Sequence, residues 1–371
     1  MKKKRIVFIS PYSGIRNVQL LKDVGLIPYY LYKNYDADVS ILTEKIDDYS
    51  YAETYVKGLK FEFIDKLDET TRYEYVKDNA LNIDCIIAFG FYGSYILPLI
   101  TYKMLNPNGK IYMALDANSF WVDRVDFRNE YFTAMMNCCD VIATSCRAMQ
   151  RHLNEKWPWN IEYISNGYFD YIGDNIPPDY SKKENIIINV ARLGTNQKRT
   201  EILMESFAQI CDKIPDWKLY LIGNIEKSFE EYIEDYFIKY PHLMTKVIFK
   251  GVISDKLQLV EEYKKSKIFA LSSNLEGGTP NVISEALFYG NAVVTTKIDA
   301  YEDAIDCGRC GKFARIGDIP DFAEKLLELC LDDNLEKMCC HAHNYAKRNY
   351  NMSRNVDKVY EMLFGGEDDE I

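Results

Sequence analysis

The chain has 371 residues, of which 47% are hydrophobic and 27% are charged, and its formal net charge is -11. This length predicts two domains of ordinary size, and the proportions are typical of a folded protein, which excludes extensive disorder. The negative charge argues against general nucleic-acid binding, which needs a basic surface. No apolar run approaches the ~18 residues that a membrane-spanning helix requires.

The N-terminal residues indicate a cytoplasmic location. Lys2–Arg5 is followed at once by Ile6–Ile9, an apolar run too short for the core of a secretory signal. The ten cysteines fit a reducing compartment if they are free. Two basic or aromatic segments suit contact with an anionic membrane surface, namely Lys2–Arg5 and Tyr29–Lys33. Basic residues before a strand, however, are more often simply solvated. We therefore expect a cytoplasmic protein and leave open peripheral contact at the inner face of the membrane.

Short apolar runs alternate with amphipathic stretches along the chain, and we predict these runs to be buried strands. Such alternation is typical of parallel sheets covered by helices on both faces. In the first half the predicted strands are Arg5–Ile9, Val39–Leu42, Ile86–Phe89, Ile111–Leu115, Val141–Thr144 and Glu162–Ile164. In the second half they are Ile186–Val190, Leu219–Ile222, Val247–Phe249, Ile268–Leu271 and Ala292–Thr295.

A change in composition separates the two halves near Ile176–Asp179. The pair Pro177-Pro178 before a polar run is typical of a short, stiff linker. We therefore predict Rossmann-like domains, with a ligand cleft at the carboxyl ends of their strands. The predicted parts are residues 1–178, residues 179–351, and residues 352–371, which hold the helical stretch Arg354–Leu363 and the acidic tail Glu367–Glu370.

The segment 275–296 is the most informative part of the chain, because a Gly-Gly turn and a helix start lie between two predicted strands. We expect Thr279 to cap this helix and Pro280 to take its first position. Pro280 donates no hydrogen bond, so Asn281 and Val282 supply the first helical amides. Together with the helix dipole, these amides suit a phosphate group.

Four charged side chains accompany this turn. Arg192 and Lys198 follow the first strand of the second half, where an arginine fork and a lysine point charge suit a diphosphate. Glu276 and Glu285 lie at the two ends of the turn, where carboxylates suit the hydroxyls of a sugar and a ribose. These residues predict a site for a sugar joined to a nucleotide diphosphate.

These motifs resemble the donor site of the family 4 retaining glycosyltransferases (glycosyl transferases group 1), which have the GT-B fold. The resemblance rests on Gly278–Ala286 and on Arg192 and Lys198, which have five residues between them as in the family. One departure is that eight residues separate Glu276 from Glu285, where the family usually has seven. The resemblance implies an α/β protein with two Rossmann-like domains, parallel sheets that face a central cleft, and a last helix that returns to the first domain.

The resemblance also implies a role for each residue. Glu276 would contact the transferred sugar and Glu285 the ribose, while Arg192 and Lys198 would neutralise the departing diphosphate. The other donor-binding residues that it implies are Gly14, after the first strand, where glycine lets backbone approach a phosphate, Gly251, where backbone groups hold the base, and the turn and helix residues Gly278, Thr279, Asn281 and Val282.

Two aspartate positions in the first half leave alternatives. Asp116 stands where many members of the family carry a histidine near the acceptor, so it either orients an acceptor hydroxyl as a catalytic residue or caps the next element. Asp36 and Asp38 form a DxD motif, which in the other glycosyltransferase fold suggests a metal-bound diphosphate. No neighbouring motif supports that role, and we interpret this DxD as a polar turn.

Cys307 and Cys310 have the spacing of a redox or zinc pair. There is no second such pair, and His341 and His343 lie far along the chain. We therefore expect neither role, and no metal site.

The resemblance implies a retaining, metal-independent hexosyl- or related transferase. It would move a sugar from a UDP- or GDP-linked donor to an acceptor hydroxyl on a glycan, a lipid-linked molecule or a protein, in bacterial glycan, polysaccharide or glycolipid assembly. No cofactor is expected, because the nucleotide-sugar is itself a substrate. Two alternatives are a noncatalytic glycosyltransferase-like partner of a sister enzyme, which the altered glutamate spacing and the missing histidine would suit, and a nucleotide-sugar epimerase of the same fold.

Overall fold

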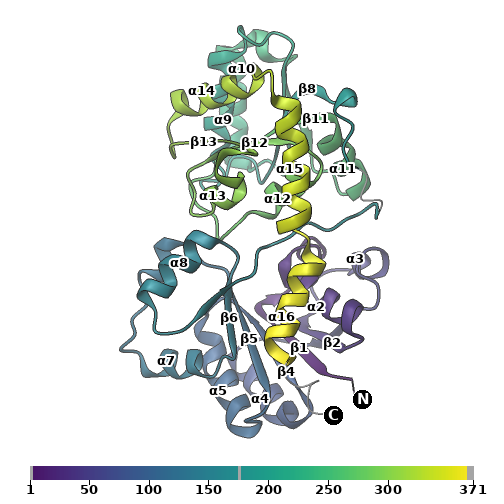
Figure 1. The fold of residues 1–371 in the computed structure, drawn as a ribbon, viewed down its shortest axis with the longest axis vertical. Coiled ribbons are helices and arrows are strands. Elements are labelled where there is room, and N and C mark those ends of the chain that lie inside the picture. Colours follow the sequence, from purple (N-terminus) through teal and green to yellow (C-terminus); the bar gives the residue numbers. More distant parts are fainter. Residues whose placement is uncertain (1–2, 174–176, 366–371) are drawn as a thin grey trace. The chain divides into compact units, whose positions relative to one another are not determined.

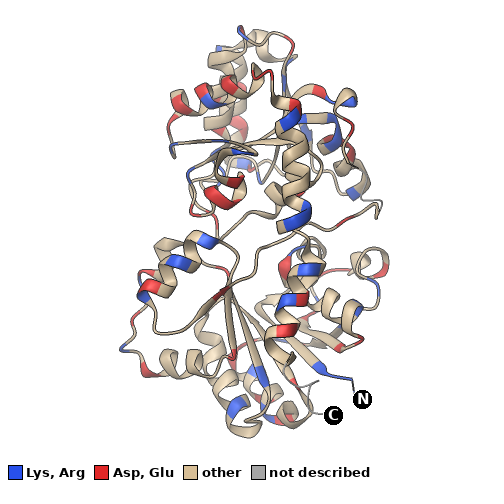
Figure 2. Cartoon of the chain, viewed as in Figure 1, with Lys and Arg blue, Asp and Glu red and all other residues tan. Residues whose placement is uncertain are grey.

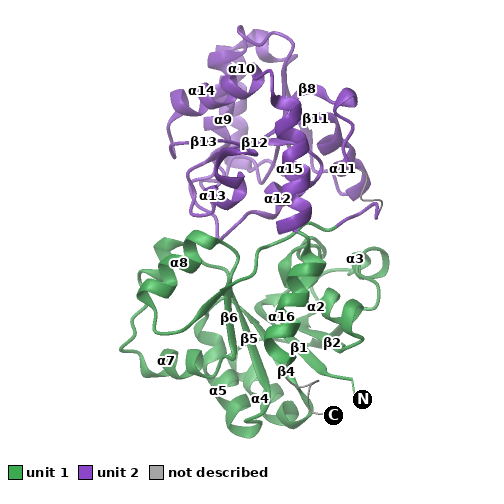
Figure 3. Cartoon of the chain, in the orientation of Figure 1, with its two compact units in different colours: residues 1–169, 351–371 green, residues 170–350 purple. Residues whose placement is uncertain are grey.

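The computed structural model describes residues 3–173 and 177–365. It divides the chain into two compact units, one of residues 1–169 and 351–371 and the other of residues 170–350 (Figure 3). Lys2, Ile176 and the tail Glu367–Glu370 lie outside the described residues.

Unit 1 is built on a parallel sheet of seven strands in the order β3-β2-β1-β4-β5-β6-β7 (Figure 1). Its strands are β1 (Arg5–Gly14), β2 (Asp38–Glu44), β3 (Lys60–Ile64), β4 (Cys85–Phe89), β5 (Lys110–Leu115), β6 (Val141–Thr144) and β7 (Ile161–Tyr163). Its helices are α1 (Asn17–Leu20), α2 (Asp23–Tyr35), α3 (Ser50–Thr54), α4 (Glu69–Asn79), α5 (Ile96–Leu105), α6 (Ser119–Val122), α7 (Glu130–Asn137), α8 (Arg147–Lys156) and α16 (Met352–Phe364).

Unit 2 contains a parallel sheet of six strands in the order β10-β9-β8-β11-β12-β13. Its strands are β8 (Glu184–Val190), β9 (Lys218–Ile222), β10 (Val247–Gly251), β11 (Ser266–Leu271), β12 (Ala292–Thr296) and β13 (Gly311–Ala314). Its helices are α9 (Thr200–Ile210), α10 (Glu230–Lys239), α11 (Lys256–Lys265), α12 (Asn281–Phe288), α13 (Tyr301–Ala304), α14 (Ile319–Cys330) and α15 (Leu335–Asn349).

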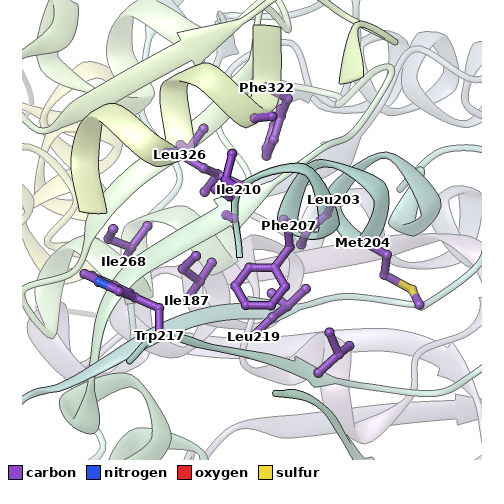
Figure 4. Packing of buried hydrophobic residues seen from close by; sticks show 14 of the residues in the cluster. Ile187, Leu203, Met204, Phe207, Ile210, Trp217, Leu219, Ile268, Phe322 and Leu326 are labelled. Atoms are coloured by element: carbon purple, nitrogen blue, oxygen red, sulfur yellow. The ribbon is translucent and has the colours of Figure 1, made fainter. Parts of the chain in front are cut away.

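A continuous apolar core lies between the second sheet and helices α9 and α14. Phe207 of α9 and Phe322 of α14 are fully buried there together with Ile187 of β8 and Ile268 of β11 (Figure 4). Because β8 and β11 are buried on both faces, they read in the sequence as unbroken apolar runs, which is typical of parallel strands.

Each predicted strand is present, and the α/β class with parallel sheets is confirmed. Two strands, β3 and β13, were not predicted. Both lie at the edge of a sheet and have partly exposed residues, so neither contains the apolar run by which buried strands are recognised.

The last helix, α16, belongs to unit 1 and packs on α2 (Figure 1). The rings of Tyr35 and Tyr360 stack with centroids 3.6 Å apart. Asn355 Nδ2 donates to the carbonyl and the hydroxyl oxygen of Ser165, at 3.0 and 2.8 Å. These contacts fasten α16 to α2 and to the segment that follows β7.

Part of the run Tyr29–Lys33, which was considered for contact with a membrane surface, is buried. In the run Tyr29–Lys33 the side chains of Tyr29, Tyr30 and Leu31 are buried, so they do not form an exposed aromatic face. Among the described residues, no helix has both the length and the apolar character needed to cross a bilayer. In the view of Figure 2, basic and acidic residues are interspersed over the helices of both units.

Candidate active site

The second sheet reverses its strand order between β8 and β11, which are hydrogen-bonded neighbours with Ile187 opposite Ile268. Since the strands are parallel, the loops that follow β8 and β11 leave the sheet at the same edge. Ligands of open α/β sheets bind at such a switch point, outside the carboxyl ends of the strands. Arg192 and Lys198 lie on the loop after β8, and the segment from Glu276 to Glu285 forms the loop after β11 and the start of α12, whereas Gly14 and Gly251 end β1 and β10.

Backbone-directed hydrogen bonds join the two loops. The amide of Asn274 donates to the carbonyl of Gln197 at 2.9 Å, and its side chain donates to the carbonyl of Asn196 at 3.0 Å. The hydroxyl of Ser272 donates to the carbonyl of Lys198 at 3.0 Å. The loop after β11 is thereby held against the loop after β8.

This pairing brings together three of the charged residues predicted to contact the donor. Lys198 Nζ forms an ion pair with Glu276 Oε1, and the two side chains are 14% and 10% exposed. Gln197 donates through Nε2 to the other carboxylate oxygen of Glu276 at 3.2 Å and accepts through Oε1 from Arg192 Nη2 at 3.0 Å. Arg192, at the open end of this chain of contacts, is exposed.

The chain of contacts has a chemical consequence. Both oxygens of Glu276 are engaged, which fixes the direction of its carboxylate despite the longer spacing to Glu285. Lys198 has three N–H donors, so its bond to Glu276 leaves donors for an anion. Gln197 was not predicted from the sequence, although it directly precedes Lys198. It was missed because a neutral side chain gives no indication of binding to a diphosphate.

Helix α12 begins one residue later than predicted. Pro280, not Thr279, is the N-cap, it provides no side-chain cap, and Asn281 is the first helical residue. Thr279 is buried ahead of the cap. The amides of Asn281 and Val282 are still the first two of the helix, and the first amides of a helix have no acceptor within it. Gly278 has a φ of 130°, a conformation that favours glycine and shapes the turn before the cap.

Glu285 is positioned from a second helix. It lies half-buried in α12 and accepts a hydrogen bond from the hydroxyl of Tyr263 of α11 at 3.1 Å. Burial, and then the charge of Glu285, raise the pKa of Tyr263, so this tyrosine remains a donor. Gly251 ends β10 with a φ of 65°, and the space that a Cβ would enter is open. Its contact with a base stays a prediction.

In unit 1, Asp116 follows β5 and is exposed. The capping role considered for it belongs to Asn118, whose side chain accepts from the amide of Trp121 at 3.3 Å. Burial first, and then the charge of Asp116, raise the pKa of Tyr92. Burial, then Tyr92 and then Asp116 raise the pKa of Tyr12.

Tyr12 and Tyr92 were not predicted as site residues. Their ring centroids are 6.5 Å apart, and they lie at the end of β1 and directly after β4. Since β1 and β4 flank the switch point of the first sheet, their position after these strands is the signal that identifies them.

Two further predictions concern residues at the ends of strands. Gly14 is buried at the end of β1, and a Cβ there would lie 2.5 Å from Ile46 Cγ1. A larger residue would therefore displace the side chain of Ile46, and approach to a phosphate stays a prediction. Asp36 lies in the turn between α2 and β2, Asp38 begins β2, and they pair with the exposed side chains of Lys3 at 2.6 Å and Lys60 at 2.5 Å.

Comparison with known proteins identifies the architecture. Residues 184–332 match the family model described as glycosyl transferases group 1. No curated protein sequence matches the chain.

Solved structures resemble the chain over nearly its whole length. A glycosyltransferase from Rickettsia africae is 14% identical with a TM-score of 0.76, and 98% of this chain and 99% of that chain are covered. HepE from Anabaena in complex with UDP is 15% identical with a TM-score of 0.73, covering 98% and 100%. The lipopolysaccharide outer core galactosyltransferase WaaB is 15% identical with a TM-score of 0.70, covering 98% and 99%.

These likenesses confirm the predicted GT-B fold. The expected resemblance to the group 1 glycosyltransferases is confirmed over residues 184–332, a stretch that contains Arg192, Lys198, Glu276 and Glu285.

Proposed function

We propose, on the premise that residues 184–332 belong with the glycosyl transferases group 1, that this chain is a retaining glycosyltransferase. It transfers a sugar from a UDP- or GDP-linked donor to an acceptor hydroxyl. The observation that carries the proposal is the contact chain Arg192–Gln197–Glu276–Lys198 at the carboxyl edge of the second sheet. HepE, which has a similar fold, has been solved with UDP and with UDP-glucose.

In this proposal the chemistry is electrostatic. As the bond between the sugar and the diphosphate breaks, negative charge grows on the leaving group. Lys198, Arg192 and the first amides of α12 stabilise that charge more strongly than they stabilise the bound donor, which lowers the barrier. Glu276 holds a sugar hydroxyl, and Glu285, fixed by Tyr263, holds the ribose.

Replacement of Lys198 tests this assignment. We expect Lys198→Ala to lower kcat by about a hundredfold or more, the effect of losing one electrostatic stabiliser. The matched control is Arg199→Ala, because Arg199 is the next residue and pairs with Glu201 instead. The assay follows release of the nucleotide diphosphate, after a thermal-shift screen of nucleotide-sugars identifies the donor. Full turnover by Lys198→Ala would remove the assignment.

The proposal includes independence from magnesium and manganese. The positive charge that the leaving group needs is supplied by Arg192, Lys198 and the helix end. The rate should therefore be the same with and without added Mg²⁺ or Mn²⁺. A rate that requires either ion would show that the diphosphate is neutralised in another way.

Two alternatives are separated by the products formed. A noncatalytic partner subunit would neither hydrolyse nor transfer any donor, alone or with acceptor, whereas an epimerase would convert a donor without forming a glycoside. The engaged positions of Lys198 and Glu276 argue against the noncatalytic partner, since a decayed site has no need to keep this pair, whereas the epimerase is separated by its product.

The acceptor side and the location are part of the same proposal. Asp116 orients the acceptor hydroxyl, with Tyr12 and Tyr92 beside it, in glycan, polysaccharide or glycolipid assembly. The ten cysteines are free in the structure, which suits the cytoplasm. If Asp116 acts on the acceptor, Asp116→Asn should reduce transfer while leaving donor binding intact.

A further inference from the structure

Three side chains of unit 2 form a cluster apart from the residues proposed to bind the donor. Asp306 begins the short helix η6 (Asp306–Gly308), Cys310 precedes β13, and His341 lies in α15. A carboxylate oxygen, the thiol sulfur and a ring nitrogen from these residues all lie within 4.8 Å of one another. The sequence separates His341 from Cys310, and only the fold brings them together.

Hydrogen bonds hold the cluster in place. His341 Nε2 lies 2.7 Å from Asp306 Oδ2, and Arg309 Nη2 donates to the other oxygen, Oδ1, at 2.6 Å. The backbone of Cys310 is fixed on both sides, since its amide donates to Ile305 and its carbonyl accepts from Val293, each at 2.9 Å. These contacts order the carboxylate of Asp306, the ring of His341 and the backbone of Cys310 before any ion is bound.

Further contacts join the neighbouring helix α13 to α15 and to Tyr350, which follows α15. The hydroxyls of Tyr345 and Tyr350 donate to the carbonyl of Asp303, at 2.8 and 2.6 Å. Tyr345 follows His341 by one helical turn and therefore lies on the same face of α15. The segment around Asp306 is thus clamped along this helix.

We propose that Asp306, Cys310 and His341 bind a zinc ion. A thiolate, an imidazole and a carboxylate are all zinc ligands, and three protein ligands leave the fourth tetrahedral position for water. His341 is 32% exposed, so the cluster reaches solvent. Cys307, which has the spacing of a metal pair with Cys310, is exposed and is not part of the group.

Charge and protons balance in this site. The S–H bond of Cys310 breaks and its proton goes to solvent, while the ring proton of His341 moves to Nδ1 and frees Nε2 for the ion. The 2+ charge is then neutralised by the thiolate and by the carboxylate of Asp306. Arg309 continues to hold the oxygen of Asp306 that does not bind the ion, as outer-shell groups of metal sites do.

An open fourth position is typical of catalytic zinc, but the place of this site in the fold implies that the ion stabilises unit 2 and takes no part in sugar transfer. Cys310 lies at the amino end of β13, whereas the proposed donor residues lie at the carboxyl edge of the same sheet. An ion here ties the edge strand β13 to α15. It should stabilise unit 2 against heat, because a ligand that binds only the folded state raises the midpoint of unfolding.

The test uses the full-length chain, stripped of metal and titrated with Co²⁺, which reports thiolate ligation by its charge-transfer absorption. We expect about one Co²⁺ per chain with this absorption, displaced by Zn²⁺. Cys310→Ser should abolish the absorption, and His341→Ala should weaken binding at least tenfold. Cys330→Ser is the matched control, since Cys330 belongs to neither His/Cys/Asp/Glu group found among the described residues.

A second group, Cys211, Asp212 and His242, could also bind the ion. The variant Cys211→Ser tests this group, and it should leave the Co²⁺ absorption unchanged. Zn²⁺ should raise the Tm of the unaltered chain and not that of His341→Ala. We expect this variant to fold, because His341 is partly exposed. The proposal is overturned if no absorption develops, if Cys310→Ser retains it, or if Cys211→Ser removes it.

Discussion

At the scale of single residues, His343 of α15 shows how burial determines a protonation state. Its ring is buried, and Nδ1 lies in hydrogen-bond range of the carbonyl of Phe288. Among the described residues, Nε2 has no hydrogen-bond partner. A second ring proton would therefore be buried without an acceptor. Burial lowers the pKa of His343, the charge of Lys347 lowers it further, and the bond to Phe288 opposes the change.

This lowered pKa predicts a loss of stability in acid. The unfolded chain takes up the proton near pH 6.5, the folded chain only at lower pH, so the free energy of unfolding falls as the pH drops below about 6.5. The slope from this residue is at most about 1.4 kcal/mol per pH unit. Urea unfolding at pH 7.5 and pH 5.5 should show a smaller difference for His343→Asn, which keeps a donor for Phe288, than for the unaltered chain. Equal differences would contradict the prediction.

At the scale of elements, the carboxyl end of α11 depends on side chains from elsewhere in unit 2. Lys183 Nζ, buried before β8, donates to the carbonyls of Ser266 at 2.7 Å, Tyr289 at 2.9 Å and Tyr263 at 3.3 Å. Asn291 donates to two of the same carbonyls. Burial lowers the pKa of Lys183 to about 8, and the side chain is held by its three carbonyl acceptors. The last carbonyls of α11 are thus satisfied by the side chains of Lys183 and Asn291.

Removal of the Lys183 amine should therefore destabilise unit 2. In Lys183→Met the apolar stem is kept, but buried carbonyls lose a donor, which costs about 1–3 kcal/mol for each group left unsatisfied. Because Asn291 still donates to the carbonyls of Tyr263 and Ser266, the carbonyl of Tyr289 is the group that loses its donor, and we expect a loss of about 1–3 kcal/mol in urea unfolding. Lys182→Met, at the exposed neighbour, should change stability by less than about 0.5 kcal/mol. Equal effects of the two changes would refute this account.

At the scale of the whole molecule, unit 1 is completed by residues from both ends of the chain. Helix α16 buries Val356, Val359, Leu363 and Phe364 and is joined to α2 by the hydrogen bonds of Asn34 to Ser353 and Asp357. The fold of unit 1 therefore cannot be complete until the last helix has been made.

A charge introduced into the interface between α16 and the rest of unit 1 should strongly lower the free energy of unfolding. We expect Val359→Asp to cost more than about 4 kcal/mol, because an unpaired carboxylate would be buried. Lys358→Asp introduces the same side chain one residue earlier, at an exposed position, and should be tolerated. Thermal unfolding of soluble protein measures the difference, and a Val359→Asp variant as stable as the control would show that α16 does not support unit 1.

The sequence by itself determined the class of the fold and the chemistry expected in unit 2. Buried parallel strands such as β4 and β11 are recognisable because burial on both faces demands unbroken apolar residues. Arg192, Lys198, Glu276 and Glu285 carry their charge and spacing in the chain itself, so they could be named without coordinates.

Tertiary structure alone decided which residues meet. The edge strands β3 and β13 form because a neighbouring strand offers hydrogen bonds, and a partly exposed strand needs no apolar pattern. Gln197 joins Arg192 to Glu276, and His341 reaches Cys310, through loops and helices that only packing brings together. Periodicity and spacing describe what lies along the chain, whereas contacts between distant residues depend on how whole elements are arranged in space.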